Sequence, residues 1–207
     1  GREIPLELRR PIPSHLEDFY QIEKHSMLEK EPPNHTRLRS LVLRAFTTRK
    51  ISQFNEELDQ LCHKLIDEFS EHEVDLLPAY AQKIPIIIIA RLLGIPEEMS
   101  DQLLSWSNAM VAMYQARRTT EIEKEANQSA ADFRVYLKAY IDERRKNPRD
   151  DLLSNLIQAE ELGEKLTTAE LISTVVILLN AGHEATVHTL GNGIKTLIET
   201  RNPKKWI

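Results

Sequence analysis

Along most of this chain, apolar residues recur three or four positions apart, the spacing of helices that bury one face. A short helix is predicted after Asn34, a candidate N-cap, and a longer one after Thr48 turns Cys62 toward the core. Further helices are predicted over Ala79 to Leu93, Glu97 to Arg117, Thr120 to Lys146, and Asp150 or Asp151 to about Glu161. With no internal repeat and no strand-rich region, the pattern predicts an all-α fold.

The near-continuous apolar run from Ile84 to Leu93 fits either a buried strand or a buried helix. The segment that begins at Ala79 is long enough for a helix, and it stops at Gly94 with Pro96 beyond. These signals favour a helix, so strand at Ile86 to Ile89 would contradict the prediction.

The last predicted helix is the longest. Thr167 and Thr168, with Glu170 behind them, form an entry signal, and apolar residues continue to about Arg201, before Pro203. At about 1.5 Å per residue this helix is about 50 Å long, so it is expected to pass through the core. The residues expected to be substantially buried on it are Ile177, Leu178 and Leu190.

The beginning of the chain differs from the rest. Three prolines stand among charged residues between Gly1 and Pro13, a pattern that resists helix and central strand. Residues 1–24 are therefore assigned to an extended N-terminal segment, and residues 25–207 to a helical core.

Composition narrows the function classes. The 207 residues carry a net charge of −5, so no overall positive field favours nucleic acid as a partner. Cys62 is the single cysteine, which excludes an intrachain disulfide and favours a reducing compartment, the cytoplasm. The longest apolar run is too short to cross a bilayer, so no transmembrane segment is predicted. Because residue 1 is Gly, the native start is left open.

A group of small and polar residues interrupts the last helix at Ala181, Gly182, His183, Glu184, Ala185 and Thr186. Glycine is unfavourable in a helix interior by about 1 kcal/mol relative to alanine, so its presence calls for a reason. A gap beside an acid and a hydroxyl would let the helix open locally, seat a small ligand or water, and relay protons. The alternative is a packing contact at Ala181 and Gly182, with Glu184 reaching solvent.

Two other groups of residues are candidates for binding sites. His183 and His188 are five residues apart, which separates them by about 140° around a helix, so no zinc site is predicted. His35 and Arg39 are four apart and project together, so they could hold a carboxylate; the alternative is an ordinary solvated basic face.

The stretch from Glu31 to Arg39, Glu-Pro-Pro-Asn-His-Thr-Arg-Leu-Arg, resembles the opening of the C helix of cytochromes P450. The resemblance continues through Leu41 to Thr47, Pro85 to Pro96 and Asp150 to Leu153, in the family's order. The motif from Ala181 to Thr186 then falls where the long I helix of the family carries its oxygen-binding groove. The sequence is thus similar to the middle of a P450, a helical domain with a long central I helix.

This resemblance implies roles for individual residues. His35 and Arg39 match residues that bind a haem propionate, Ala181 and Gly182 match the groove, and Glu184 matches the acid of the proton-delivery pair. The family's oxygen-activating threonine follows that acid directly. Here Ala185 holds that position and Thr186 comes one place later, about 100° further round the helix.

The resemblance also implies what else the family needs. Its haem iron is held by a thiolate on a Gly-containing loop after the I helix, and the sequence ends before such a loop, so it is expected to be a truncated member. Cys62 precedes the I helix on an apolar stripe and does not match that ligand. No protein residue is therefore assigned to the metal.

Two hypotheses follow. In the first, the intact protein is a haem-thiolate monooxygenase that inserts one oxygen atom from O2 into a small organic substrate, with electrons from a ferredoxin-type or other redox partner, while this chain alone is inactive and holds no thiolate-ligated haem. In the second, it is a non-catalytic helical fragment that binds a ligand or partner. Core surface left exposed is expected to make the chain a homo-oligomer.

Overall fold

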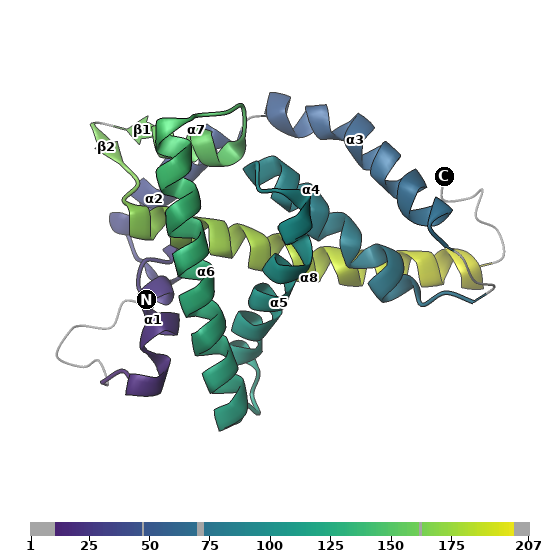
Figure 1. The fold of residues 1–207 in the computed structure, drawn as a ribbon, viewed down its shortest axis with the longest axis horizontal. Coiled ribbons are helices and arrows are strands. Elements are labelled where there is room, and N and C mark those ends of the chain that lie inside the picture. The colour runs from purple at the N-terminus through teal and green to yellow at the C-terminus, as the bar shows by residue number, and fades with distance from the viewer. Residues whose placement is uncertain (1–10, 47, 70–72, 162, 201–207) are drawn as a thin grey trace.

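The computed structural model describes residues 11–46, 48–69, 73–161 and 163–200. These residues form an almost wholly helical structure (Figure 1). The α-helices are α1 (Glu17–Glu23), α2 (Asn34–Ala45), α3 (Thr48–Asp67), α4 (Lys83–Leu93), α5 (Ser100–Val111), α6 (Thr120–Lys146), α7 (Leu152–Gln158) and α8 (Thr168–Glu199). Short 3-10 turns are η2 (Ser14–Leu16), η3 (Met27–Glu29), η5 (Glu97–Met99) and η6 (Ala112–Tyr114), and η4 (Leu77–Ala81) is a π-helix.

Helix α8 organises the fold. Its 32 residues extend for about 48 Å, and Figure 1 shows it running the length of the molecule, with α6 crossing its first half. Helices α4, α5 and α6 all pack against it. A capping box begins the helix, as the sequence predicts: the Glu170 amide donates to Thr167 Oγ1, and the Thr167 amide donates to the Glu170 carboxylate.

The core lies where α6 and α8 meet the other helices. Phe133 and Leu137 of α6 and Leu171 and Leu179 of α8 are wholly buried within it. Trp106 of α5 covers Phe133, with the two ring centroids 5.1 Å apart. The predicted all-α class is confirmed, and Ile177, Leu178 and Leu190 are partly buried, with Leu178 and Leu190 packed against the core.

The predicted helix from Ala79 to Leu93 has no strand at Ile86 to Ile89, but it is divided, because the turn residue Gln82 separates η4 from α4. Pro85 has no N–H to bond the carbonyl of Ala81, so the regular hydrogen-bond ladder of α4 starts only at Lys83. Before that point the Gln82 amide bonds Leu77, five residues back, in the π-helix η4. Gly94 ends α4 as predicted, with a left-handed φ of 70°.

Two expectations need correction. Residues 14–23, assigned to an extended segment, are helical in η2 and α1, because Leu16, Phe19 and Ile22 recur every third residue and bury one face against the core. The helix from Asp151 ends at Gln158, not near Glu161, and a two-stranded antiparallel hairpin follows, β1 (Glu160–Glu161) and β2 (Glu164–Lys165). Gly163, with φ of 81°, makes its turn.

Smaller differences concern helix ends. Asn34 is the first residue of α2 rather than its cap, which is Pro33, and no side chain bonds there. Helical structure after Glu97 ends at Tyr114 rather than Arg117, whereas α6 has the predicted bounds, Thr120 to Lys146. Cys62 is half-buried on α3. Residues 1–10, Arg201 and Pro203 lie outside the described residues. The predicted extended conformation before Pro11 and the predicted end of the last helix past Thr200 are therefore untested.

Candidate functional site

The small-residue motif lies at the middle of α8, and the helix runs through it without opening. Ala181, Glu184, Ala185 and His188 are all exposed, and their spacing places them on one face of the helix. Two alanines and one carboxylate therefore form a shallow, open strip beside which a flat group could lie. The exposed carboxylate of Glu184 pairs loosely with His188, with 4.0 Å between Oε1 and Nε2.

Gly182 does not belong to that strip. A Cβ atom at this position would come within 2.7 Å of Ile89 Cδ1, so the absence of a side chain lets α8 approach α4 closely. Two residues before Gly182, the Asn180 Oδ1 atom accepts a hydrogen bond from Ser107 of α5 at 2.7 Å. The alternative prediction, a packing contact between helices, is therefore confirmed at Gly182 but not at Ala181, which is exposed.

The hydroxyl of Thr186 is also turned from the strip. It follows Gly182 by four residues, so the two share one row of the helix, and its Oγ1 donates to the Gly182 carbonyl at 2.8 Å. Thr189 makes the same bond to Ala185. At the position nearest the acid on the exposed face, Ala185 offers a methyl group and no hydroxyl.

His183 and His188 lie in different surroundings, as their spacing predicts. His183 is buried, 5% exposed, against the junction of η4 and α4, while His188 is exposed. Burial lowers the pKa of His183, and its hydrogen bond with the Gln82 backbone offsets this only in part. Its Nε2 atom is buried without a partner among the described residues. No cluster of three metal-binding side chains occurs in the part of the chain that the structure describes.

His35 and Arg39 both lie on α2, four residues apart on one face. His35 is half-buried and Arg39 exposed, and neither side chain bonds another of the described residues. They can therefore hold an anionic group between an imidazole and a guanidinium. Glu170, at the start of α8, touches α2, but the motif begins eleven residues later, about 16 Å along the helix. The structure thus places the pair near one end of α8 and the motif at its middle.

Sequence reasoning missed two polar groups. Arg37, between His35 and Arg39, pairs with Glu170 and, through Nε at 3.2 Å, with Glu164. Burial works to raise the pKa of Glu170, but hydrogen bonds from Thr167 and Arg37 outweigh it and hold that pKa below its ordinary value. Both partners are distant in sequence, so no local pattern signals the contact.

The second group centres on Arg144, buried near the end of α6. It donates to Asp151 at 3.0 Å and to the Gly94 carbonyl at 3.1 Å, and it lies over the ring of Tyr140. Because Asp151 caps α7 and Gly94 ends α4, one arginine ties three helices together. The sequence placed Arg144 among cations at a helix end, where exposure is the ordinary expectation.

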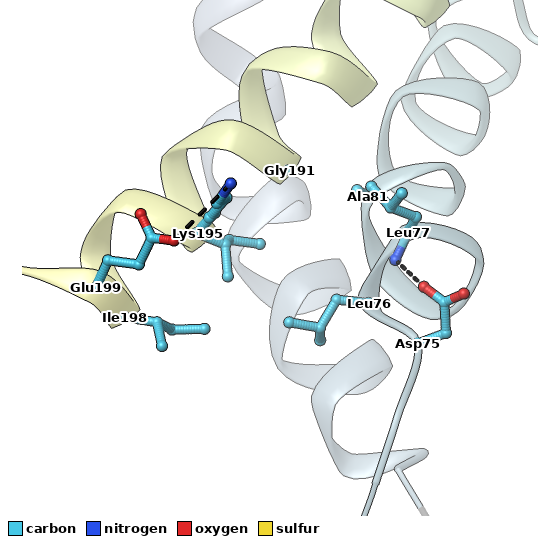
Figure 2. Close-up of a pocket in the computed structure, with 9 residues that line it drawn as sticks. Asp75, Leu76, Leu77, Ala81, Gly191, Lys195, Ile198 and Glu199 are labelled. Atoms are coloured by element: carbon cyan, nitrogen blue, oxygen red, sulfur yellow. Dashed lines mark hydrogen bonds and ion pairs between the residues drawn. The ribbon is translucent and has the colours of Figure 1, made fainter.

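A pocket of about 280 Å³ lies further along α8, between its last turns and η4. Figure 2 shows Leu76 and Leu77 facing Gly191 and Ile198 across it, with the Lys195–Glu199 pair on the α8 side. It is separate from the strip at Ala181 to His188, and no local sequence pattern indicates it. Among the described residues, no helix is long and apolar enough to span a bilayer.

Comparisons with known proteins agree on one family. The family model for cytochrome P450 matches residues 7–205. The polyketide biosynthesis cytochrome P450 PksS of Bacillus subtilis (strain 168) is 40% identical over 184 residues, which are 88% of this chain and 44% of PksS. The vitamin D(3) 25-hydroxylase of Pseudonocardia autotrophica is 34% identical over 86% of this chain and 43% of its own.

Solved structures show the same likeness. P450BioI, in complex with an acyl carrier protein ligated to hexadec-9Z-enoic acid, superposes with a TM-score of 0.86 at 27% identity, over 99% of this chain and 52% of P450BioI. The structure of PksS gives a TM-score of 0.80 at 37% identity, over 91% of this chain and 48% of PksS. The chain spans about half the length of the proteins it matches, or less.

Proposed function

This chain belongs to the cytochrome P450 family, and on that premise we propose that the protein is a haem-thiolate monooxygenase acting on a small organic substrate. The observation that carries the proposal is the exposed strip of Ala181, Glu184 and Ala185 on α8, which follows a fully buried stretch of the same helix, residues 171–176. Small side chains leave room over a flat ring, and the one acid among them faces that room.

Haem fits the residues that are present. His35 and Arg39 project from one face of α2 and bond no other described side chain, so both are available to donate to propionate oxygens. Ala181 and Ala185 leave α8 flat enough for a ring edge to approach. Haem with a thiolate ligand would supply the oxygen chemistry, one atom of O2 going to substrate and one to water with two electrons and two protons.

Glu184 is the residue proposed to move protons. It is exposed and has a weak contact with His188, so its carboxylate is free to exchange protons with water and pass them along the strip. Thr186 is proposed to assist, which requires its hydroxyl to leave the Gly182 carbonyl, since Ala185 offers none. The cost of breaking one hydrogen bond, about 1 kcal/mol, makes Thr186 secondary to Glu184.

Cys62 is not proposed as the iron ligand. It lies half-buried on α3 beside Tyr80, and burial together with the Cys62 contact raises the pKa of Tyr80 to about 12. Cys62 also belongs to a regular helix, α3, and not to a loop that could present its sulfur to a haem iron. The chain has no other cysteine. After reconstitution with haem, reduction and addition of carbon monoxide, the chain should therefore not show the absorption spectrum of thiolate-ligated haem. A thiolate-type spectrum that is lost in Cys62→Ser would contradict this.

Product formation by the intact protein, loaded with haem that carries its thiolate ligand, tests the proposal. Glu184→Gln should lower turnover on the order of a hundredfold, the usual contribution of a positioned proton-transfer group. Glu199→Gln is the matched control, because its side chain is similarly exposed, 64% against 58%, on the same helix but away from the strip. Equal turnover in the two variants would contradict the role of Glu184.

Substrate, electron donor and assembly belong to this proposal too. We propose a small organic substrate lying over the strip and electrons from a separate, ferredoxin-type protein. P450BioI is seen with a fatty acid on a carrier protein, so a carrier-bound substrate is one form to assay. Pairing of two chains through exposed apolar residues such as Ile198 stays a prediction, as does a cytoplasmic location.

A further inference from the structure

Three basic side chains stand at alternate positions on α2, and they do different things. His35 and Arg39 have no bonding partner among the described residues, whereas Arg37 is bound to two carboxylates. At about 100° per residue, His35 and Arg39 each lie about 160° from Arg37, on the opposite side of the helix. Holding Arg37 therefore sets the direction in which the other two point.

The anchor of Arg37 is itself fixed. Its side chain is 27% exposed and that of Glu170 is 11% exposed, so the pair is better shielded from water than ordinary surface pairs. Glu170 Oε2 accepts from the Thr167 amide at 2.8 Å, which locks the carboxylate into the capping box of α8. Glu164, at 3.2 Å, holds the guanidinium from the hairpin side. Figure 1 shows α2 beside the hairpin and the start of α8.

We propose that Arg37 and Glu170 are positioning residues, which fix the rotation of α2 about its axis so that His35 and Arg39 face the haem propionates. The inference rests on the proposed function. One carboxylate then has two tasks: it starts the helix that carries Glu184, and it orients the helix that carries the propionate ligands. The haem contacts made by α2 and by α8 would thereby both be positioned by the same carboxylate.

A competing explanation comes from the apolar stripe of α2. Leu38, Leu41, Val42 and Ala45 are buried and lie roughly at right angles to Arg37. Their packing could set the rotation of the helix alone, which would leave the ion pair without consequence for haem. The test has to separate these two causes.

The rate of haem loss from the haem-loaded protein to an excess of a high-affinity haem acceptor provides the readout. The first variant, His35→Ala combined with Arg39→Ala, should speed haem loss and so tests the proposed function alone. Arg37→Gln should speed it about ten- to hundredfold, the usual cost of losing a partner that orients a ligand. In the His35→Ala, Arg39→Ala background, Arg37→Gln should add almost nothing, because no propionate ligands remain to be oriented.

Two further variants keep the test independent of general destabilisation. Glu170→Gln retains the hydrogen-bonding shape that a capping box accepts but removes the charge, and it should reproduce the Arg37→Gln effect. Arg134→Gln breaks another interhelix pair, with Asp18 at 2.7 Å, and should leave haem loss unchanged. If Arg37→Gln has no effect, or adds the same factor in both backgrounds, the positioning role is refuted. If His35→Ala with Arg39→Ala has no effect, the propionate contact itself is refuted.

Discussion

The two halves of α8 have the same secondary structure and opposite surroundings. Every residue from Leu171 to Val176 is buried, whereas from Ala181 to Glu199 only His183 and Val187 are. The first half is surrounded by other helices on all sides, and the second half is packed along one side only. The residues proposed to take part in proton transfer lie in the second half. A long helix can thus serve as scaffold at one end and present a reactive face at the other.

Core substitutions should separate the halves most strongly. Leu171 is wholly buried in the first half, and Leu171→Ala should lower the free energy of unfolding by about 2–5 kcal/mol through lost burial and a cavity. Ile198 in the second half is 68% exposed, so Ile198→Ala should change it by less than about 0.5 kcal/mol. Urea unfolding of both variants measures this, and similar losses would contradict the contrast.

Glycine substitutions should show that the open half still has one packed side. Gly182→Val would force a side chain against Ile89 and should destabilise the chain by about 1–3 kcal/mol. Gly193 has no atom within 4 Å of an added Cβ, so Gly193→Val should cost nothing and gain a few tenths of a kcal/mol of helix propensity, roughly. The same denaturation experiment compares them. A loss at Gly193 as large as at Gly182 would mean that this face is covered.

The smallest effect concerns pH. The pKa of His183 is lowered in the folded chain from an ordinary value of 6.5, because burial disfavours the imidazolium. Between the two pKa values the unfolded chain binds a proton that the folded chain does not, so stability falls as pH drops below about 6.5, by at most about 1.4 kcal/mol per pH unit. His183→Gln should remove this slope. His188→Gln, at an exposed site, should keep it, and equal slopes in all three proteins would disprove the assignment.

Local signals in the sequence determined much of this protein. The Thr167–Glu170 capping box, the stop at Gly94 and the apolar periodicity of α6 each depend on residues within a few positions of one another, and all three appear in the structure as predicted. The motif of Ala181 to Thr186 was visible for the same reason, because small and polar residues stand out within an apolar run.

Tertiary structure decided the rest. Whether Gly182 opened a groove or packed against Ile89 depended on a helix ninety residues away, and so did the burial of His183. Arg37 looked like its basic neighbours until Glu170, far along the chain, was brought beside it. Periodicity fixes which residues share a face, because that depends on helix geometry alone. What a face meets depends on how helices distant in sequence pack, and no local pattern contains that information.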